Sequence, residues 1–124
     1  MSKPFYIHYD TGAWSPINGP NHLEASFNLE PELKAAWLKA LREGKYQQAR
    51  QRLRCGNGFC CLGVLCDLLY PAAWDQDELV LVGVRYDKFA PVALLPKQLQ
   101  RALAKMNDSG MSFEQIADWL EEYL

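Results

Sequence analysis

The sequence predicts a single small α+β domain over residues 1–124, mostly helical, with a buried central helix and a small antiparallel sheet. The chain is 49% hydrophobic and 23% charged, which suits one compact domain with its own core. Several stretches carry apolar residues at helical spacing, and one stretch is apolar on nearly every face. Residues 79–86 alternate with the period of a strand. These periods together indicate helices and strands around one core.

Residues 1–28 form an aromatic segment, rich in proline and glycine, that we expect to pack on a body formed by residues 29–124. Residues 5–9 alternate in the manner of a strand. The Gly, Pro and Asn residues between positions 11 and 20 predict turns in a long irregular stretch. Trp14 should lie against the body, because a polar tail would not need a large apolar ring.

The first helix is predicted over residues 31–43, since Pro31 suits the first helical position and Gly44 supplies a stop. Its apolar stripe consists of Leu33, Ala36, Trp37, Ala40 and Leu41. Residues 45–54 fit a helix and an extended segment almost equally well, so both alternatives stay open.

The buried central helix is predicted over residues 59–70, with Phe59 on its inner side. Apolar residues on nearly every side of this stretch indicate a helix enclosed by the rest of the core. Three segments are expected to pair in the small antiparallel sheet: 79–86, 92–95 and, as a third strand, 5–9.

Two helices are expected near the C-terminus, at residues 96–106 and from Ser112 onward. Residues 107–110 should interrupt the helical pattern between them. Ser112 and Gln115 have the spacing of a capping box. The buried face of the last helix is predicted to hold Phe113, Ile116, Ala117, Leu120 and Leu124.

The charge balance argues against partners that need a strong positive field. Thirteen Lys and Arg residues against fifteen Asp and Glu residues give a net charge of -2. No apolar run reaches the length of a membrane span, and the N-terminus lacks the apolar core of an export signal. We therefore expect a cytoplasmic protein that does not engage a membrane and keeps its thiols reduced.

All four cysteines lie within residues 55–66, at Cys55, Cys60, Cys61 and Cys66. Their spacing differs from the usual zinc knuckle, so we predict buried apolar residues, no metal site and no cofactor. The alternative is a cysteine-centred enzyme or metal-binding protein that uses Cys60 or Cys55 with His8 or His22. In that alternative, the start of the central helix would lower the pKa of Cys60.

A basic segment at residues 39–54 supports a second alternative, in which its cations contact the phosphates of a nucleic acid. The negative net charge favours a solvated helix face instead. The chain has no phosphate-binding glycine loop and no nucleophile elbow, so we assign no catalytic residue and favour a non-enzymatic binding protein. The candidate binding residues are Arg42, Lys45, Arg50, Arg52 and Arg54 from the basic segment, and Tyr6, Tyr9 and Trp14 from the aromatic segment.

Two blocks of the sequence resemble a family of small phage and prophage proteins of unknown function. The first block is FCCLGVLCD at residues 59–67, and the second is NDSG at 107–110 followed by SFEQIADWLE at 112–121. The resemblance implies no catalytic residue. It implies a phage-encoded accessory protein in the bacterial cytoplasm that binds a host protein or a small ligand, including inhibition of a defence system such as CRISPR.

Overall fold

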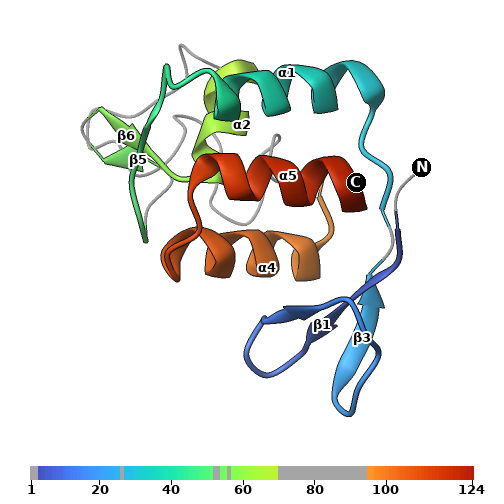
Figure 1. Ribbon diagram of the computed structural model, residues 1–124. Coiled ribbons are helices and arrows are strands. Elements are labelled where there is room, and N and C mark those ends of the chain that lie inside the picture. The colour runs from blue at the N-terminus through green and yellow to red at the C-terminus, as the bar shows by residue number, and fades with distance from the viewer. Residues whose placement is uncertain (1–2, 26, 52–53, 56, 70–94) are drawn as a thin grey trace.

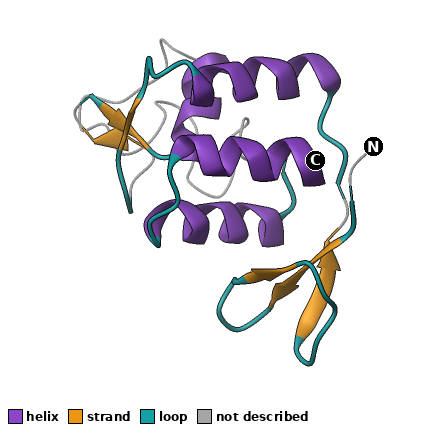
Figure 2. Ribbon diagram, in the orientation of Figure 1, coloured by secondary structure: helices purple, strands orange, loops and turns teal. Residues whose placement is uncertain are grey.

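The computed structural model describes residues 3–25, 27–51, 54–55, 57–69 and 95–124 (Figure 1). In this part of the chain the helices are α1 (Pro31–Arg42), α2 (Cys61–Leu69), α4 (Lys97–Asp108) and α5 (Phe113–Tyr123). Figure 2 shows the helices packed together, with strands on two sides of them. The predicted α+β class and single small domain are confirmed. None of the helices in these ranges is long and apolar enough to span a bilayer.

Short strands form two sheets on opposite sides of the helices (Figure 1). The N-terminal sheet has the order β2-β1-β3, and both of its pairings are antiparallel. In the second sheet, β6 lies parallel to β4 and antiparallel to β5. The strands of the N-terminal sheet are β1 (Phe5–His8), β2 (Trp14–Ser15) and β3 (His22–Ala25), and those of the second sheet are β4 (Gln47–Gln48), β5 (Arg54–Cys55) and β6 (Gly58–Phe59).

The N-terminal sheet differs from the predicted sheet in the strands that accompany residues 5–9. β1 lies where that strand was expected, but its partners β2 and β3 come from the stretch predicted to be irregular. Strands this short leave too few residues for a visible alternation of polar and apolar positions. The expected strands at 79–86 and 92–95 lie outside the described residues, except Leu95, which precedes α4 without joining a strand.

α2 is the predicted buried central helix. Each residue from Cys61 to Cys66 is buried. The indole Nε1 of Trp37, on α1, donates a hydrogen bond of 3.0 Å to the carbonyl oxygen of Cys61. The sequence placed the start of this helix too early, because Phe59 lies in β6, where pairing with β4 and β5 holds it extended.

The other helices follow their predicted apolar faces closely. The expected inner residues of α5 are all buried, whereas Ala36 on α1 is exposed. The capping box at Ser112 is confirmed, since its hydroxyl accepts from the Gln115 N–H and the Gln115 side chain accepts from the Ser112 N–H. α4 continues to Asp108, beyond its predicted end at Met106.

Asn107 explains why α4 extends into the expected break. Its side chain is fully buried, and it is the buried polar residue of the described ranges. The Oδ1 atom accepts hydrogen bonds from Nε2 of Gln48 at 2.9 Å and from the N–H of Cys61 at 3.2 Å. Its Nδ2 atom donates to the carbonyl oxygen of Ala49 at 2.8 Å. One amide therefore joins the end of α4, the start of α2 and the strand β4.

The neighbouring Asp108 holds the chain beyond β4. Its Oδ1 atom accepts a 2.7 Å hydrogen bond from the N–H of Gln51. Gln51 has a φ of 69°, a left-handed conformation that costs energy for a residue with a side chain. Residues 45–54 are therefore extended and turned rather than helical where they are described, because Asn107 and Asp108 bind their backbone.

The N-terminal sheet packs on the end of α5 through aromatic rings. Phe5 meets Trp119 edge to face, with ring centroids 4.9 Å apart. Trp14 meets both Trp119, at 5.6 Å, and Tyr123, at 5.2 Å, in the same manner. Such edge-to-face pairs add to the stability gained by burying the rings. Trp14 thus lies against the helices, as the sequence predicted.

Asn107→Ala should lower the free energy of unfolding by about 2–4 kcal/mol, because it leaves the buried Cys61 N–H and Ala49 carbonyl without their partner. Urea unfolding followed by tryptophan fluorescence measures this change. The exposed Asn18 provides the matched control, and Asn18→Ala should stay within about 0.5 kcal/mol of the parent. Equal losses in the two variants would contradict the structural role of Asn107.

Ser112→Ala should cost about 1 kcal/mol of stability, because the N–H of Gln115 loses its acceptor at the start of α5. Thermal unfolding followed by circular dichroism measures it. Ser109→Ala serves as the control, since the Ser109 hydroxyl makes only a long contact of 3.4 Å with the Met106 carbonyl. A Ser112→Ala variant as stable as Ser109→Ala would argue against the capping box.

Candidate functional site

The described thiols lie in the interior around the start of α2. Cys60, Cys61 and Cys66 are all buried. The sulfur of Cys60 accepts a 3.3 Å contact from the N–H of Gly63, in the place that a serine hydroxyl often takes before a helix. The Cys61 thiol donates to the carbonyl oxygen of Leu103 at 3.6 Å. These sulfur atoms are part of the packing between α2 and α4.

Burial makes these thiols harder to ionise than free cysteine. It raises the pKa of Cys60 to about 11 and that of Cys66 to about 12. The pKa of the fully buried Cys61 is also raised well above its ordinary value, mainly for the same reason. The expectation that the helix start lowers the pKa of Cys60 is wrong, because desolvation outweighs the hydrogen bonds from the N–H groups of Gly63 and Leu62.

The two histidines lie together, but in the N-terminal sheet. His8 and His22 are opposite each other on β1 and β3, with ring centroids 5.1 Å apart. This sheet and the start of α2 are on opposite sides of the helices, so neither imidazole reaches Cys60 (Figure 1). Cys55 lies in β5, also on the far side from the histidines. Within the described ranges, no three His, Cys, Asp or Glu residues gather in a way that could hold a metal ion.

The basic segment contributes part of its charge to internal contacts. The guanidinium of Arg42 donates to Asp118 Oδ1 at 2.7 Å and to Glu121 Oε2 at 2.8 Å, which ties α1 to α5. The guanidinium of Arg54 lies 5.1 Å from the centre of the Phe59 ring. These two predicted binding residues therefore have structural partners.

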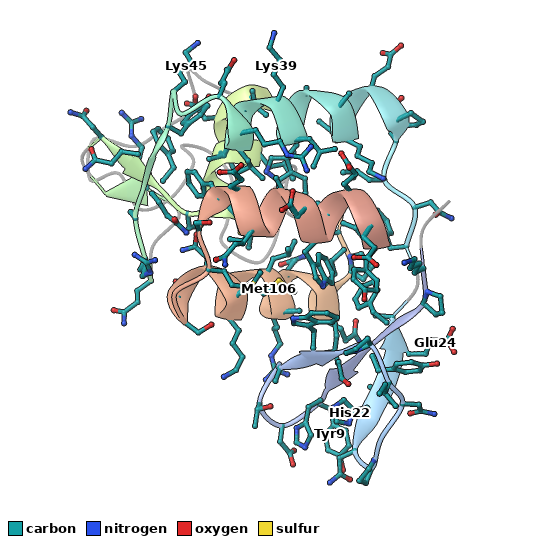
Figure 3. All side chains as sticks on the ribbon, in the orientation of Figure 1. Tyr9, His22, Glu24, Lys39, Lys45 and Met106 are labelled. Atoms are coloured by element: carbon teal, nitrogen blue, oxygen red, sulfur yellow. The ribbon has the colours of Figure 1, made fainter. Side chains whose placement is uncertain are left out.

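The remaining cations of the segment are exposed or fall outside the described ranges. Lys45 and Arg50 are exposed, and Arg52 is outside the residues that the structure describes. Figure 3 shows Lys39 and Lys45 pointing away from the helices, on the side opposite the N-terminal sheet. The described residues of the segment give no continuous row of free cations for a phosphate backbone.

The aromatic candidates are divided between the two faces of the N-terminal sheet. Trp14 is paired with Ile7, so both side chains lie on the face toward the helices. Tyr6 is paired with Glu24 and lies on the opposite face, with His8. Tyr9 follows β1, is 48% exposed, and donates from its hydroxyl to Asn21 Oδ1 at 2.9 Å.

Trp14 lines a hollow of about 140 Å³ between the N-terminal sheet and α4. The turn at residues 12–13 forms one side of it. Arg101 holds that turn in place, because its Nη1 atom donates to the carbonyl oxygen of Tyr9 at 3.1 Å. The other lining residues come from α4 and the segment after it: Ala102, Lys105, Met106, Ser109 and Met111. Met106 is labelled in Figure 3.

Trp14 was predicted from the sequence as a binding residue, whereas Lys105 and Met111 were not. The two sides of the hollow are about ninety positions apart in the chain, and no local pattern connects them. The site could have been predicted only from the contact between Arg101 and the turn after β1, and the sequence gives no sign of that contact.

Exposed apolar side chains are also concentrated on this part of the molecule. Four large hydrophobic side chains are exposed in the described ranges, and three of them belong to the N-terminal sheet and its loops: Tyr9, Ile17 at 72% and Leu23 at 47%. The fourth is Leu69, at the end of α2. Exposed apolar groups that gather in one region often mark an interaction surface.

Residues 29–101 match the model of a protein family that is described as a domain of unknown function, DUF8296. The chain belongs to this family. The matched region includes α1, the second sheet and α2, whereas β1 to β3 and α5 lie outside it. No curated protein and no solved structure matches the chain.

Iodoacetamide should label the buried thiols of the folded protein roughly 100 times more slowly than those of the urea-unfolded chain. The thiols concerned are those of Cys60, Cys61 and Cys66. Their raised pKa values keep them protonated at neutral pH, so raising the pH to about 9 should not produce the labelling expected of an ordinary thiol. Peptide mass spectrometry assigns the label to each cysteine. Fast labelling of Cys60 at neutral pH would restore the thiol-enzyme alternative.

Proposed function

We propose that this protein is a non-enzymatic binding protein of phage type that holds a protein of the bacterial host against the hollow beside Trp14. The observation that carries the proposal is the hollow itself. It lies between the aromatic segment and α4, and the N-terminal sheet with its loops also carries three exposed large apolar side chains.

The lining of the hollow suits one kind of group on the partner. Trp14, Met106 and Met111 supply apolar surface, and methionine side chains adapt to the shape of what they contact. Lys105 is exposed and adds a positive charge to the same lining. We infer that the partner inserts an apolar side chain and places a carboxylate near Lys105.

The state of the thiols supports a binding role over catalysis. A nucleophilic cysteine must form a thiolate near neutral pH and must be reachable by substrate. Cys60 has a pKa of about 11 and is buried, which works against both requirements.

The host protein is proposed on the resemblance of the FCCLGVLCD and NDSG blocks to small phage proteins. A phage accessory protein of this kind acts on a component of the bacterial cytoplasm, including the proteins of a defence system. The contacts of Arg42 and Arg54 support a protein rather than a nucleic acid as partner, because they engage two of the predicted phosphate ligands.

Lys105→Trp tests the proposal, because it fills the hollow from an exposed helical position and removes the positive charge. Affinity capture from bacterial lysate should recover a stoichiometric partner with the parent protein and lose it with Lys105→Trp. Lys39→Trp is the matched control, since Lys39 is an exposed helical lysine that points away from this region (Figure 3). It should retain the partner.

Circular dichroism and thermal unfolding of both variants establish that each one is folded. Capture that is equal for Lys105→Trp and Lys39→Trp would contradict a site at the hollow. Failure of the parent protein to recover any stoichiometric protein would contradict the host-protein proposal as a whole.

A further inference from the structure

β3 forms an edge of the N-terminal sheet, and its residue Leu23 is 47% exposed. β1 pairs with one side of β3, and no strand of the described ranges pairs with the other side. Proteins usually protect a free edge with a charge, a proline or a covering segment, because an open edge can pair with another chain. On this short edge the exposed Leu23 lies beside one charged residue, Glu24, so pairing must bring a group of suitable charge opposite that carboxylate.

The direction of the backbone groups on β3 follows from the observed hydrogen bonds. The N–H of Tyr9 donates to the carbonyl oxygen of Asn21 at 3.0 Å, which makes these residues a hydrogen-bonded pair. Hydrogen-bonded and non-hydrogen-bonded pairs alternate along an antiparallel ladder, so Leu23 also points its backbone groups toward β1. The backbone groups of His22 and Glu24 point away from β1, toward the free edge.

One of the backbone groups of β3 that point toward the free edge already has a partner within the chain. The N–H of His22 donates to the carbonyl oxygen of Gly19 at 3.2 Å. The carbonyl oxygen of His22 and both backbone groups of Glu24 find no hydrogen-bond partner among the described residues and face the free edge. An incoming strand that pairs with all three groups would offer an acceptor and a donor opposite Glu24, and a donor opposite His22.

A second β3 strand supplies the acceptor opposite Glu24 and the donor opposite His22 when it runs antiparallel with the two-fold axis at Leu23. The Glu24 carbonyl oxygen then stays exposed to water, because the His22 N–H that faces it already donates to Gly19. His22 of each copy then lies opposite Glu24 of the other copy, and the Glu24 N–H of each copy donates to the His22 carbonyl oxygen of the other. The two leucines lie opposite each other on one face. On the other face, each imidazole lies next to a carboxylate.

The side chains of His22 and Glu24 favour the register with the axis at Leu23 over registers in which the axis lies one residue away. A shift that brings His22 opposite His22, or Glu24 opposite Glu24, places like groups together, which is unfavourable for directly opposed residues on a sheet. The register at Leu23 gives two complementary His–Glu contacts. It also covers the exposed apolar side chain of β3.

We propose that this protein forms a two-fold homodimer in which β3 of each copy pairs antiparallel with β3 of the other, so that the two N-terminal sheets become one continuous sheet. The partner for this edge is a second copy of the chain. The strands are four residues long, so the dimer is weak and forms reversibly with concentration. It uses the edge opposite β2, and it goes beyond the host-protein binding proposed for the hollow.

Sedimentation equilibrium of the full chain over a range of concentrations tests the proposal. The parent protein should show a monomer–dimer equilibrium. Glu24→Lys and His22→Glu should each weaken the dimer about tenfold, because the first removes the carboxylate that faces His22 and the second places two carboxylates opposite each other. The double variant H22E/E24K restores opposite charges in the same register and should recover most of the lost affinity.

Glu43→Lys is the matched control, because it makes the same charge change at an exposed position after α1. It should leave the dimer unchanged, and thermal unfolding shows whether every variant is folded. The proposal is overturned by a parent protein that stays monomeric at every concentration. It is also overturned by a dimer that Glu24→Lys does not weaken, or by a double variant no better than the single ones. None of these results depends on the host protein. A negative result would therefore overturn the homodimer, whereas the binding of a host protein at the hollow is tested separately by Lys105→Trp.

Discussion

The hydrogen bonds of the buried Asn107 side chain are the interaction on which the rest of this structure depends. Its amide bonds to Gln48, Ala49 and Cys61 at once, and so it positions a strand, the first residue of α2 and the last turn of α4 relative to one another. A buried amide is tolerated only where its donors and acceptors have partners. Each of its two polar atoms is satisfied here, which makes the arrangement specific as well as stable.

The hydrogen bond between Asn107 and Cys61 connects two blocks of the sequence, FCCLGVLCD at residues 59–67 and NDSG at residues 107–110. The FCCLGVLCD block supplies the Cys61 N–H, and the NDSG block supplies the Asn107 side chain that receives it. The two blocks meet in the core, where the sulfur of Cys60 accepts from the N–H of Gly63 at the start of α2. The recognition surface that we propose lies elsewhere, on the N-terminal sheet and α4, where side chains remain accessible.

The helices were predictable because their apolar periodicity and the Ser112 capping box are local features of the sequence. Two other features depend on contacts between distant residues, so the sequence left the first of them undecided and did not predict the second. The extended course of residues 47–51 is imposed by Asn107 and Asp108, and Arg42, which resembled a free binding residue, is paired with Asp118 and Glu121. The hollow likewise lies between segments about ninety positions apart in the chain, which a hydrogen bond from Arg101 to the Tyr9 carbonyl oxygen connects. No pattern within a short window could reveal these pairings.

Residues 58–69, which carry the buried thiols, build the core, and we propose that the N-terminal sheet and α4 contact the partner. Hydrogen–deuterium exchange of the free protein and of its complex with a captured host protein tests this claim most directly. The account predicts slower exchange at residues 9–17 and 101–111 in the complex, with residues 58–69 unchanged. Slower exchange confined to residues 39–51 or 58–69 would contradict it.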